Sequence, residues 1–226
     1  MEQDSGVRDS LTGLKTRPAL EADLRRALKE SAASVRKSVA LATLDVDHFK
    51  QVNDQFGVDA GDCVLRSLAD LLEAEAPGNA YRLSGDEFAL LLPGLSLGQA
   101  FLRMEALRVR VEDALRRLDL PAGNDTPADR SVTITAGVAH CPRDARDVPG
   151  LFKAADAALQ SAKDTGRNQV GLPPNQEMVM KSSYYPAASV RKLKNLAERT
   201  GRKESHLLRE ALGDLLRKYD TAPQED

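Results

Sequence analysis

Short apolar runs alternate along the first 170 residues with longer stretches in which leucines recur at helical spacing. Val39 to Leu44 is an apolar run of the length that a buried strand needs. Tyr81 to Leu92 contains two such runs around a Ser-Gly turn, which predicts a hairpin. Apolar residues also alternate along Ser131 to His140, as in a half-buried strand. The predicted strands are therefore 39–44, the two arms of 81–92, 131–140 and a short one at 169–170.

The stretches between these strands carry apolar residues every three or four positions with charges between them, the pattern of amphipathic helices. Gly61-Asp62 is expected to open one of these helices and Pro77-Gly78 to close it. The order β-α-α-β-β-α-β-α-β predicts an α+β fold of the palm type, with helices packed on a mostly antiparallel sheet. The predicted helices are 14–31, 48–56, 62–76, 96–118 and 148–163.

Two adjacent carboxylates, Asp86 and Glu87, stand at the tip of the predicted hairpin, and Asp45 directly follows the 39–44 strand. If that strand lies beside the hairpin, the three acids form a hard-oxygen site suited to Mg²⁺ or Mn²⁺. Such a site serves nucleotidyl transfer, because the ion neutralises a triphosphate and lowers the pKa of an attacking hydroxyl. The alternatives are ordinary structural uses, with Asp45 as a helix N-cap and Asp86 as a turn residue.

Ser84-Gly85-Asp86-Glu87-Phe88 resembles the GGDEF signature of diguanylate cyclases, with serine in place of the first glycine. Further segments resemble the same family, in its order, over residues 5 to 171. The resemblance implies a palm-like nucleotide cyclase domain that condenses two GTP into cyclic di-GMP and releases pyrophosphate. The matching segments are Asp9-Ser-Leu-Thr-Gly-Leu14 with Arg17, Asp45-x-Asp-x-Phe-Lys50, Asn53-Asp54, Gly57, Gly61-Asp62 and Lys163-x-x-Gly-Arg167-Asn168.

By this resemblance the acids take separate roles. Asp45 and Glu87 would bind the metal ions together with the backbone carbonyl of Val46. Asp86 would help to activate the ribose 3′-hydroxyl, and Gly85 would let the backbone approach the substrate.

The resemblance also implies substrate contacts. Phe49 and Lys50 open a helix whose free N–H groups can bind phosphate, and Lys163 and Arg167 would add phosphate contacts. Asn53 and Asp62 resemble the family's guanine-reading residues, and an acid at position 62 favours GTP over ATP. The alternatives are a solvated surface charge for Lys50, an offset of the helix dipole for Lys163, and helix capping for Asn53 and Asp62.

The formal net charge of −2 hides an uneven distribution along the chain. Residues 177–219 contain ten Lys or Arg and five Asp or Glu, a net charge of +5, which suggests a polyanionic partner. Two prolines in Gly171-Leu-Pro-Pro-Asn-Gln176 indicate a linker. We therefore expect a cyclase domain at 1–171, a linker at 172–177, a basic domain at 178–219 and an acidic tail at 220–226.

The basic segment is expected to fold as one strand, 178–185, and two helices, 188–200 and one that begins at Ser205. A β-α-α unit of about 42 residues cannot bury a core alone, so dimerisation is expected. The spacing Thr200-Gly201-x-x-x-Ser205, with leucines on both sides, resembles the ribbon-helix-helix DNA-binding family.

That second resemblance implies that strands from two chains pair and enter the major groove of double-stranded DNA. The strand has few basic residues for reading bases, so a dimerisation unit that does not touch DNA is the alternative. The residues that would contact DNA are Met180, Ser182 and Tyr184, with Lys181 if the register shifts by one, and Arg202, Lys203 and Ser205 near the second helix.

No apolar run approaches the roughly 20 residues of a membrane span, and the first residues do not resemble a signal peptide. The two cysteines form no metal or disulfide pattern, so we expect a cytoplasmic homodimer that does not enter a membrane.

Two functions are compatible with the sequence. One is a diguanylate cyclase coupled to a dimeric DNA-binding unit, and the other is a transcription regulator that responds to GTP or cyclic di-GMP with little turnover. The presence of all the expected acids and phosphate-binding cations favours the cyclase.

Overall fold

The computed structural model describes residues 8–32, 38–118, 132–173 and 185–202, and residues 204, 205, 207, 208, 211, 212, 215 and 218. The chain divides into two compact units, Met1–Gln176 and Glu177–Asp226. Each unit is described by itself below. Among the described residues, no helix combines the length and the apolar character that crossing a bilayer requires.

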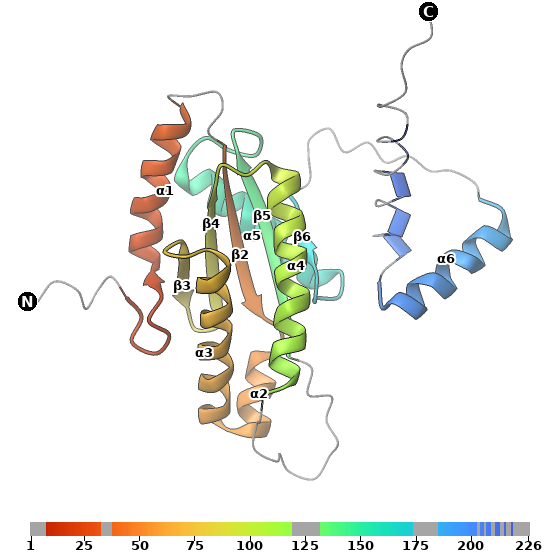
Figure 1. Ribbon diagram of the computed structural model, residues 1–226, viewed down its shortest axis with the longest axis horizontal. Helices are drawn as coiled ribbons and strands as arrows, with labels where there is room; N and C mark the ends of the chain where they lie inside the picture. Colours follow the sequence, from red (N-terminus) through yellow and green to blue (C-terminus); the bar gives the residue numbers. More distant parts are fainter. Residues whose placement is uncertain are drawn as a thin grey trace, which may run out of the picture. The chain divides into compact units, whose positions relative to one another are not determined.

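A six-stranded mixed sheet forms the centre of the first unit (Figure 1). The strands lie in the order β1-β3-β4-β2-β5-β6. The pairings are antiparallel except at the two edges, where β1 runs parallel to β3 and β6 parallel to β5. The mostly antiparallel sheet of the sequence prediction is confirmed. The strands are β1 (Lys15–Thr16), β2 (Val39–Val46), β3 (Ala80–Ser84), β4 (Glu87–Pro93), β5 (Ile134–Cys141) and β6 (Val170–Gly171).

Helices cover both faces of this sheet, and Figure 1 shows α3 and α4 in front of it and α5 behind. Ala40 and Leu44 of β2 pack with the α3 and α4 core, whereas Val39 and Leu41 pack with α1 and α5. Burial on both faces explains why β2 is an unbroken apolar run rather than an alternating one. The helices of this unit are α1 (Arg17–Ala32), α2 (Phe49–Phe56), α3 (Val58–Glu75), α4 (Leu97–Arg116) and α5 (Val148–Asp164).

Several element boundaries differ from the sequence prediction, and two of them lie near the predicted site residues. The strand predicted to end at Leu44 continues to Val46, because both of its last two residues pair with β5. Helix α3 begins at Val58 and not at Asp62. Gly57, with φ 88°, both ends α2 and precedes α3, so the break between these helices lies there. Strand β1, two polar residues at the edge of the sheet, was not predicted because its pattern is too short to detect.

The second unit contains α6 (Ala187–Thr200), which ends at Gly201 in the left-handed conformation, φ 64°. A glycine C-cap at this position agrees with the sequence prediction. The described residues between 204 and 218 are all helical, as expected for the second helix. The predicted strand at 178–185 lies, except for Tyr185, outside the described residues.

Candidate catalytic site

The site begins where the end of β2 lies beside the hairpin tip. Asp45 and Glu87 are directly opposite each other in the antiparallel β2–β4 pair. The backbone N–H of Val46 donates to the carbonyl oxygen of Asp86 at 3.3 Å. The condition that the sequence left open, that the 39–44 strand lies beside the hairpin, is therefore fulfilled. Directly opposed residues share a face of the sheet, so Asp45 and Glu87 lie on one side of it.

An arginine that the sequence reasoning missed holds the hairpin turn. Arg82 Nε and Nη2 donate to the carbonyl oxygen of Gly85 at 3.0 and 2.7 Å. Its Nη1 forms an ion pair with Asp9 Oδ1 at 2.8 Å. Gly85 has φ 40°, in the left-handed region that favours glycine. A lone basic residue in an otherwise apolar hairpin arm was the one signal that pointed to Arg82.

Serine at the first position of the motif contacts the second of the adjacent acids. Ser84 Oγ donates a hydrogen bond to Glu87 Oε2 at 2.7 Å. A glycine cannot make this contact because it has no side chain. The substitution that distinguishes this chain from the family signature therefore orients one of the expected metal ligands.

Helix α5 brings a cation to the other acid. Lys163 Nζ lies 2.7 Å from Asp45 Oδ2, and both side chains are largely buried. Burial raises the pKa of Asp45 above its ordinary value of 3.8, the ion pair with Lys163 lowers it, and the charges of Asp86 and Asp47 raise it again. The pKa of Asp45 is raised overall, because the ion pair with Lys163 does not fully offset burial and the neighbouring negative charges. An additional cation at this carboxylate would favour its ionised form.

Among the described residues, no three acidic, histidine or cysteine side chains are grouped as a ready metal site. The expected convergence of three acids therefore holds for the chain segments and not for the arrangement of their oxygens, because Asp45 is turned to Lys163 and Glu87 to Ser84. The available donors are carboxylate and carbonyl oxygens, which Mg²⁺ and Mn²⁺ prefer. Asp45 already binds one cationic group, the Lys163 ammonium. The residues present thus fit a divalent cation.

A second cluster joins α2 to α3. The Asn53 Oδ1 atom is buried and has no hydrogen-bond partner. A methyl group built on Gly61 would lie 1.8 Å from that oxygen and 3.1 Å from the Phe49 ring. The glycine therefore leaves room for the Asn53 amide, whose oxygen lacks a donor. Native proteins seldom leave a buried acceptor unpaired unless a ligand or water supplies the donor.

Comparison with known proteins agrees with this geometry. The family described as "Diguanylate cyclase, GGDEF domain" matches residues 7–169. The chain belongs to the GGDEF family. Within the second unit, a ribbon-helix-helix domain matches residues 182–220.

Individual GGDEF relatives are moderately similar. YhcK of Bacillus subtilis, an uncharacterised protein, is 37% identical over 171 residues, which are 75% of this chain and 46% of YhcK. The diguanylate cyclase TpbB of Pseudomonas aeruginosa is 34% identical over 161 residues, or 70% of this chain and 35% of TpbB. The chain thus spans less than half the length of these relatives. The crystal structure of the DgcB GGDEF domain from Caulobacter crescentus, in complex with c-di-GMP, superposes with a TM-score of 0.64 at 31% identity, covering 76% of this chain and 97% of that one.

Three further predicted substrate residues lie on α2, on α3 and in the turn after α5. Lys50 lies in the first turn of α2 and is exposed, and Asp62 lies on α3 with Arg66 Nη2 3.7 Å away. Arg167 is exposed, in the turn after α5, and has a positive φ of 57°. The substrate contacts of these three residues stay predictions.

The predicted DNA-contacting residues fall mostly outside the described part of the chain. Met180, Lys181, Ser182, Tyr184 and Lys203 lie outside it. Arg202 and Ser205 are described, the former just after the Gly201 cap and the latter in helical conformation.

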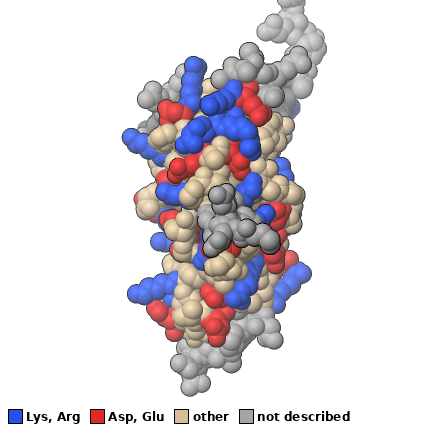
Figure 2. Space-filling view, turned by 90° about the vertical axis from the view of Figure 1, so that its left-hand side faces the viewer, with Lys and Arg blue, Asp and Glu red and all other residues tan. Residues whose placement is uncertain are grey.

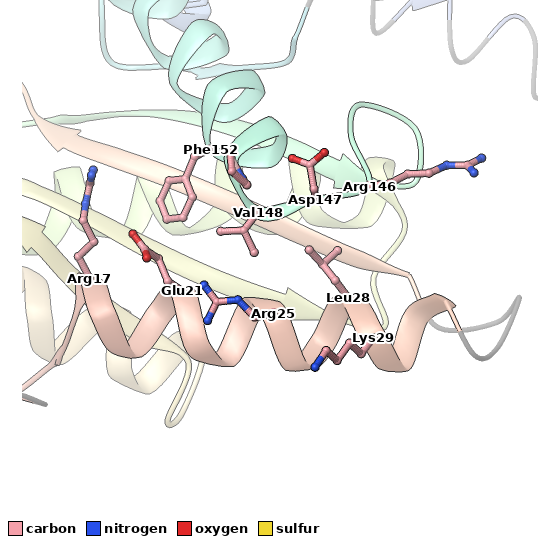
Figure 3. Close-up of a pocket in the computed structure, with 10 residues that line it drawn as sticks. Arg17, Glu21, Arg25, Leu28, Lys29, Arg146, Asp147, Val148 and Phe152 are labelled. Carbon is pink, nitrogen blue, oxygen red and sulfur yellow. The ribbon is translucent and has the colours of Figure 1, made fainter.

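A separate hollow of about 670 Å³ lies between α1 and the start of α5 (Figure 3). Its lining combines apolar, basic and acidic side chains, which are Leu28, Val148 and Phe152, Arg17, Arg25, Lys29 and Arg146, and Glu21 and Asp147. Figure 2, which looks onto the α1 side of the molecule, shows Lys and Arg gathered toward the top and mixed charges below. None of the expected catalytic acids lines this hollow, so it is distinct from the site at the GGDEF turn.

Proposed function

We propose that this chain is a diguanylate cyclase, which condenses two GTP into cyclic di-GMP and releases two pyrophosphates. The observation that carries the proposal is the register of β2 and β4, which places Asp45 opposite Glu87 beside the Gly85-Asp86 turn. Family membership supports it, as do relatives that are diguanylate cyclases at 32–34% identity.

In this proposal Asp45, the Val46 carbonyl and Glu87 would hold Mg²⁺ or Mn²⁺. When bound, the ion neutralises charge on the triphosphate and lowers the pKa of the 3′-hydroxyl. Asp86 accepts the proton of that hydroxyl as its oxygen bonds to the α-phosphorus of the other GTP, and the bond from that phosphorus to pyrophosphate breaks. Two such transfers close the ring. The Arg82 clamp on Gly85 fixes the turn that carries Asp86.

Substrate binding uses the two sides of the site differently. Phosphate contacts are assigned to Phe49, Lys50 and the open amino end of α2, and to Lys163 and Arg167. The Asn53 oxygen, buried without a donor, is suited to accept from a guanine N–H, and Asp62 on α3 supplies a second acceptor. Adenine presents no matching pair of donors on that edge, so GTP is the substrate that satisfies this site.

The reaction requires two copies, because each domain holds one GTP and the two must face each other. The second unit offers a means of pairing, since Val190, Leu208, Leu212 and Leu215 expose apolar side chains. A second copy that covers these side chains would remove their apolar surface from water, which a unit this small cannot do by itself. Pairing through it raises the effective concentration of one GTP-bound domain near the other.

The test is incubation of the purified chain with GTP and MgCl₂, with pyrophosphate and cyclic di-GMP measured over a range of protein concentrations. We expect both products, and a rate per molecule that rises with protein concentration until dimers saturate. Asp45→Asn and Glu87→Gln should each reduce the rate by at least about 100-fold, because each removes a ligand charge. Asp70→Asn, on the exposed side of α3, is the matched control and should leave the rate unchanged. No pyrophosphate at any concentration would contradict the proposal.

A specific observation supports a role on DNA as well. The ribbon-helix-helix match at 182–220 coincides with the segment of net charge +5. We propose that this unit binds double-stranded DNA as a dimer, with residues 180–184 on the bases and Arg202, Lys203 and Ser205 on phosphate. The second candidate function, a regulator that responds to GTP or cyclic di-GMP with little turnover, shares this binding.

A gel-shift titration with genomic fragments, with and without GTP or cyclic di-GMP, tests the DNA proposal. Arg202→Ala with Lys203→Ala should weaken binding of all fragments about equally, since phosphate contacts carry little sequence information. Undiminished binding by that variant would remove the phosphate assignment. Binding that responds to nucleotide in a protein without cyclase activity would favour the second candidate.

A further inference from the structure

A buried polar network holds the turn that contains Arg167. The reaction proposed above gives this network no role. Its centre is Asp47, which is 3% exposed. The Asp47 carboxylate accepts hydrogen bonds from Thr133 Oγ1 at 2.7 Å, Thr135 Oγ1 at 2.6 Å and the backbone N–H of Asn168 at 3.0 Å. One side chain thereby joins the end of β2, the strand β5 and the turn that follows α5.

The Asn168 side chain continues the network to α4. Arg108 Nη1 donates to Asn168 Oδ1 at 2.6 Å, and Asn168 Nδ2 donates to Glu112 Oε2 at 3.2 Å. Arg108 is itself held by ion pairs to Glu105 and Glu112 at 3.2 and 3.4 Å. Asn168 is therefore fixed through its backbone on one side and through its amide on the other.

The held turn has an unfavourable backbone. Gly166, Arg167 and Asn168 have consecutive positive φ values of 112°, 57° and 44°. The left-handed conformation costs roughly 1 kcal/mol or more for a residue with a Cβ, and it persists where the surroundings fix it. Here the surroundings are Asp47 and Arg108, and the Arg167 N–H also bonds to the Ala162 carbonyl at 3.1 Å.

We propose that Asp47 and Asn168, supported by Arg108, are positioning residues that hold Arg167 toward the triphosphate of GTP. This inference rests on the phosphate role given to Arg167 in the proposed function. Asp47 lies two residues beyond Asp45 in the chain and bonds to Asn168, the residue after Arg167. This bond therefore ties the segment that carries Asp45 to the turn that carries Arg167. Lys163 lies in the last turn of α5 and pairs with Asp45, whereas Arg167 follows the helix in the turn that Asp47 and Asn168 hold.

The experiment is a double-mutant cycle with Asn168→Gly and Arg167→Ala in the full chain. Glycine tolerates the positive φ and removes the bonds to Arg108 and Glu112, so the fold should survive, with a melting temperature within a few degrees of wild type. We expect Asn168→Gly to raise KM for GTP about tenfold with kcat changed less than about twofold, since the phosphate contact is made in ground and transition states alike. The double variant should match Arg167→Ala alone.

Two further variants complete the design. Arg108→Lys keeps the positive charge beside Glu105 and Glu112 and removes the forked donor, so it should act in the same direction as Asn168→Gly. Asn79→Gly, in the turn before β3, is the matched control and should change neither constant. If the effects of Asn168→Gly and Arg167→Ala multiply, Asn168 does not act through Arg167 and the inference is overturned.

The same proteins separate this inference from the proposed function. If wild type binds GTP without turnover, the proposed reaction fails, and the cycle in GTP dissociation constants, measured by calorimetry, still decides the positioning role. If wild type does not bind GTP, both fail.

Discussion

At the scale of single residues, Asn53 carries a buried side-chain acceptor that has no hydrogen-bond donor. Its amide oxygen is buried and has no donor, and Gly61 is the neighbour whose missing side chain makes room for it. A buried acceptor without a partner costs about 1–3 kcal/mol. A guanine N–H would remove this cost, and a base that lacks the donor would not.

Gly61→Ala should therefore damage GTP binding more than stability. The new methyl group would meet Asn53 Oδ1, the mobile end of a side chain, which can turn away with a loss of stability of about 1 kcal/mol or less. We expect GTP affinity to fall about tenfold or more and the preference for GTP over ATP to narrow. Calorimetry with both nucleotides measures this. Asn53→Ala should reproduce the loss, and an Asn53→Ala protein further weakened by Gly61→Ala would contradict the mechanism.

Two acids, Asp9 and Asp23, bond to side chains of the strands β1 and β3 and give the fold a defined pH dependence. Burial raises the pKa of Asp9, but hydrogen bonds from Thr12 and Arg82 outweigh it and lower the pKa overall. Burial likewise raises the pKa of Asp23, and bonds from Lys15 and Tyr81 bring it below the ordinary 3.8. Carboxyls with lowered pKa values stabilise the folded state above pH 3.8, and this contribution is lost as the pH falls below that value.

Asp9→Asn should therefore destabilise the chain by about 1–2 kcal/mol at pH 7, because Arg82 loses a charged partner. Urea unfolding of wild type and variant between pH 7 and pH 2.5 measures the difference. We expect it to shrink below pH 4 as Asp9 in wild type is protonated. A difference that stays constant with pH would show that the charge of Asp9 is not what Arg82 needs.

At the scale of elements, the position of α5 on the sheet decides whether Lys163 reaches Asp45. The helix lies very close to β5 at Gly137, where an added methyl group would be 2.1 Å from the Ala155 carbonyl oxygen and 2.3 Å from the Leu159 nitrogen. Both contacts are to backbone, which cannot rotate away. The glycine in β5 thus sets the separation between helix and sheet.

Gly137→Ala should destabilise the fold by about 2–3 kcal/mol, because α5 must move outward. The melting temperature should fall and KM for GTP should rise, since Lys163 moves with the helix. Gly98→Ala is the control: it lies in α4 with no heavy atom near the added methyl group, and it should be neutral or stabilising by up to about 1 kcal/mol. Unchanged melting of Gly137→Ala would refute the close approach.

At the scale of the whole molecule, two units of different character share one chain. The first has a core on each face of its sheet. The second, in its described residues, has a single buried apolar residue, Ala197, and several exposed ones. Both the proposed reaction between two bound GTP molecules and the exposed apolar side chains of the second unit would be served by a second copy of the chain.

Leu212→Glu should disrupt that pairing, because Leu212 is 56% exposed in the single chain and would be covered in a dimer. We expect light scattering at micromolar concentration to show monomers, and the cyclase rate per molecule to fall and to depend steeply on concentration. Arg191→Glu, an exposed change of charge on α6, is the control and should leave the mass unchanged. A dimeric Leu212→Glu protein with full activity would show that the chain pairs by another surface.

Much of the site could be predicted from local patterns. The hairpin tip with Asp86 and Glu87 and the strand that leads to Asp45 follow from apolar runs and a turn pair, and the structure places them together. The boundary at Val58 was missed because Gly61 looked like a helix start, whereas it serves the packing against Asn53. The short strand β1 was missed because two residues carry no periodicity.

The sequence by itself determined which acids and cations are present, which strands are buried on both faces and where the net charge of the chain changes sign. These properties depend on residues that are near one another in the chain. Only the tertiary structure decided that Lys163 pairs with Asp45, that Arg82 closes the Gly85 turn and that Asp47 holds Asn168. Each of these contacts joins residues whose separation in space depends on how helices and strands pack. No local pattern encodes that distance, because it is set by the sum of many side chains in the two cores.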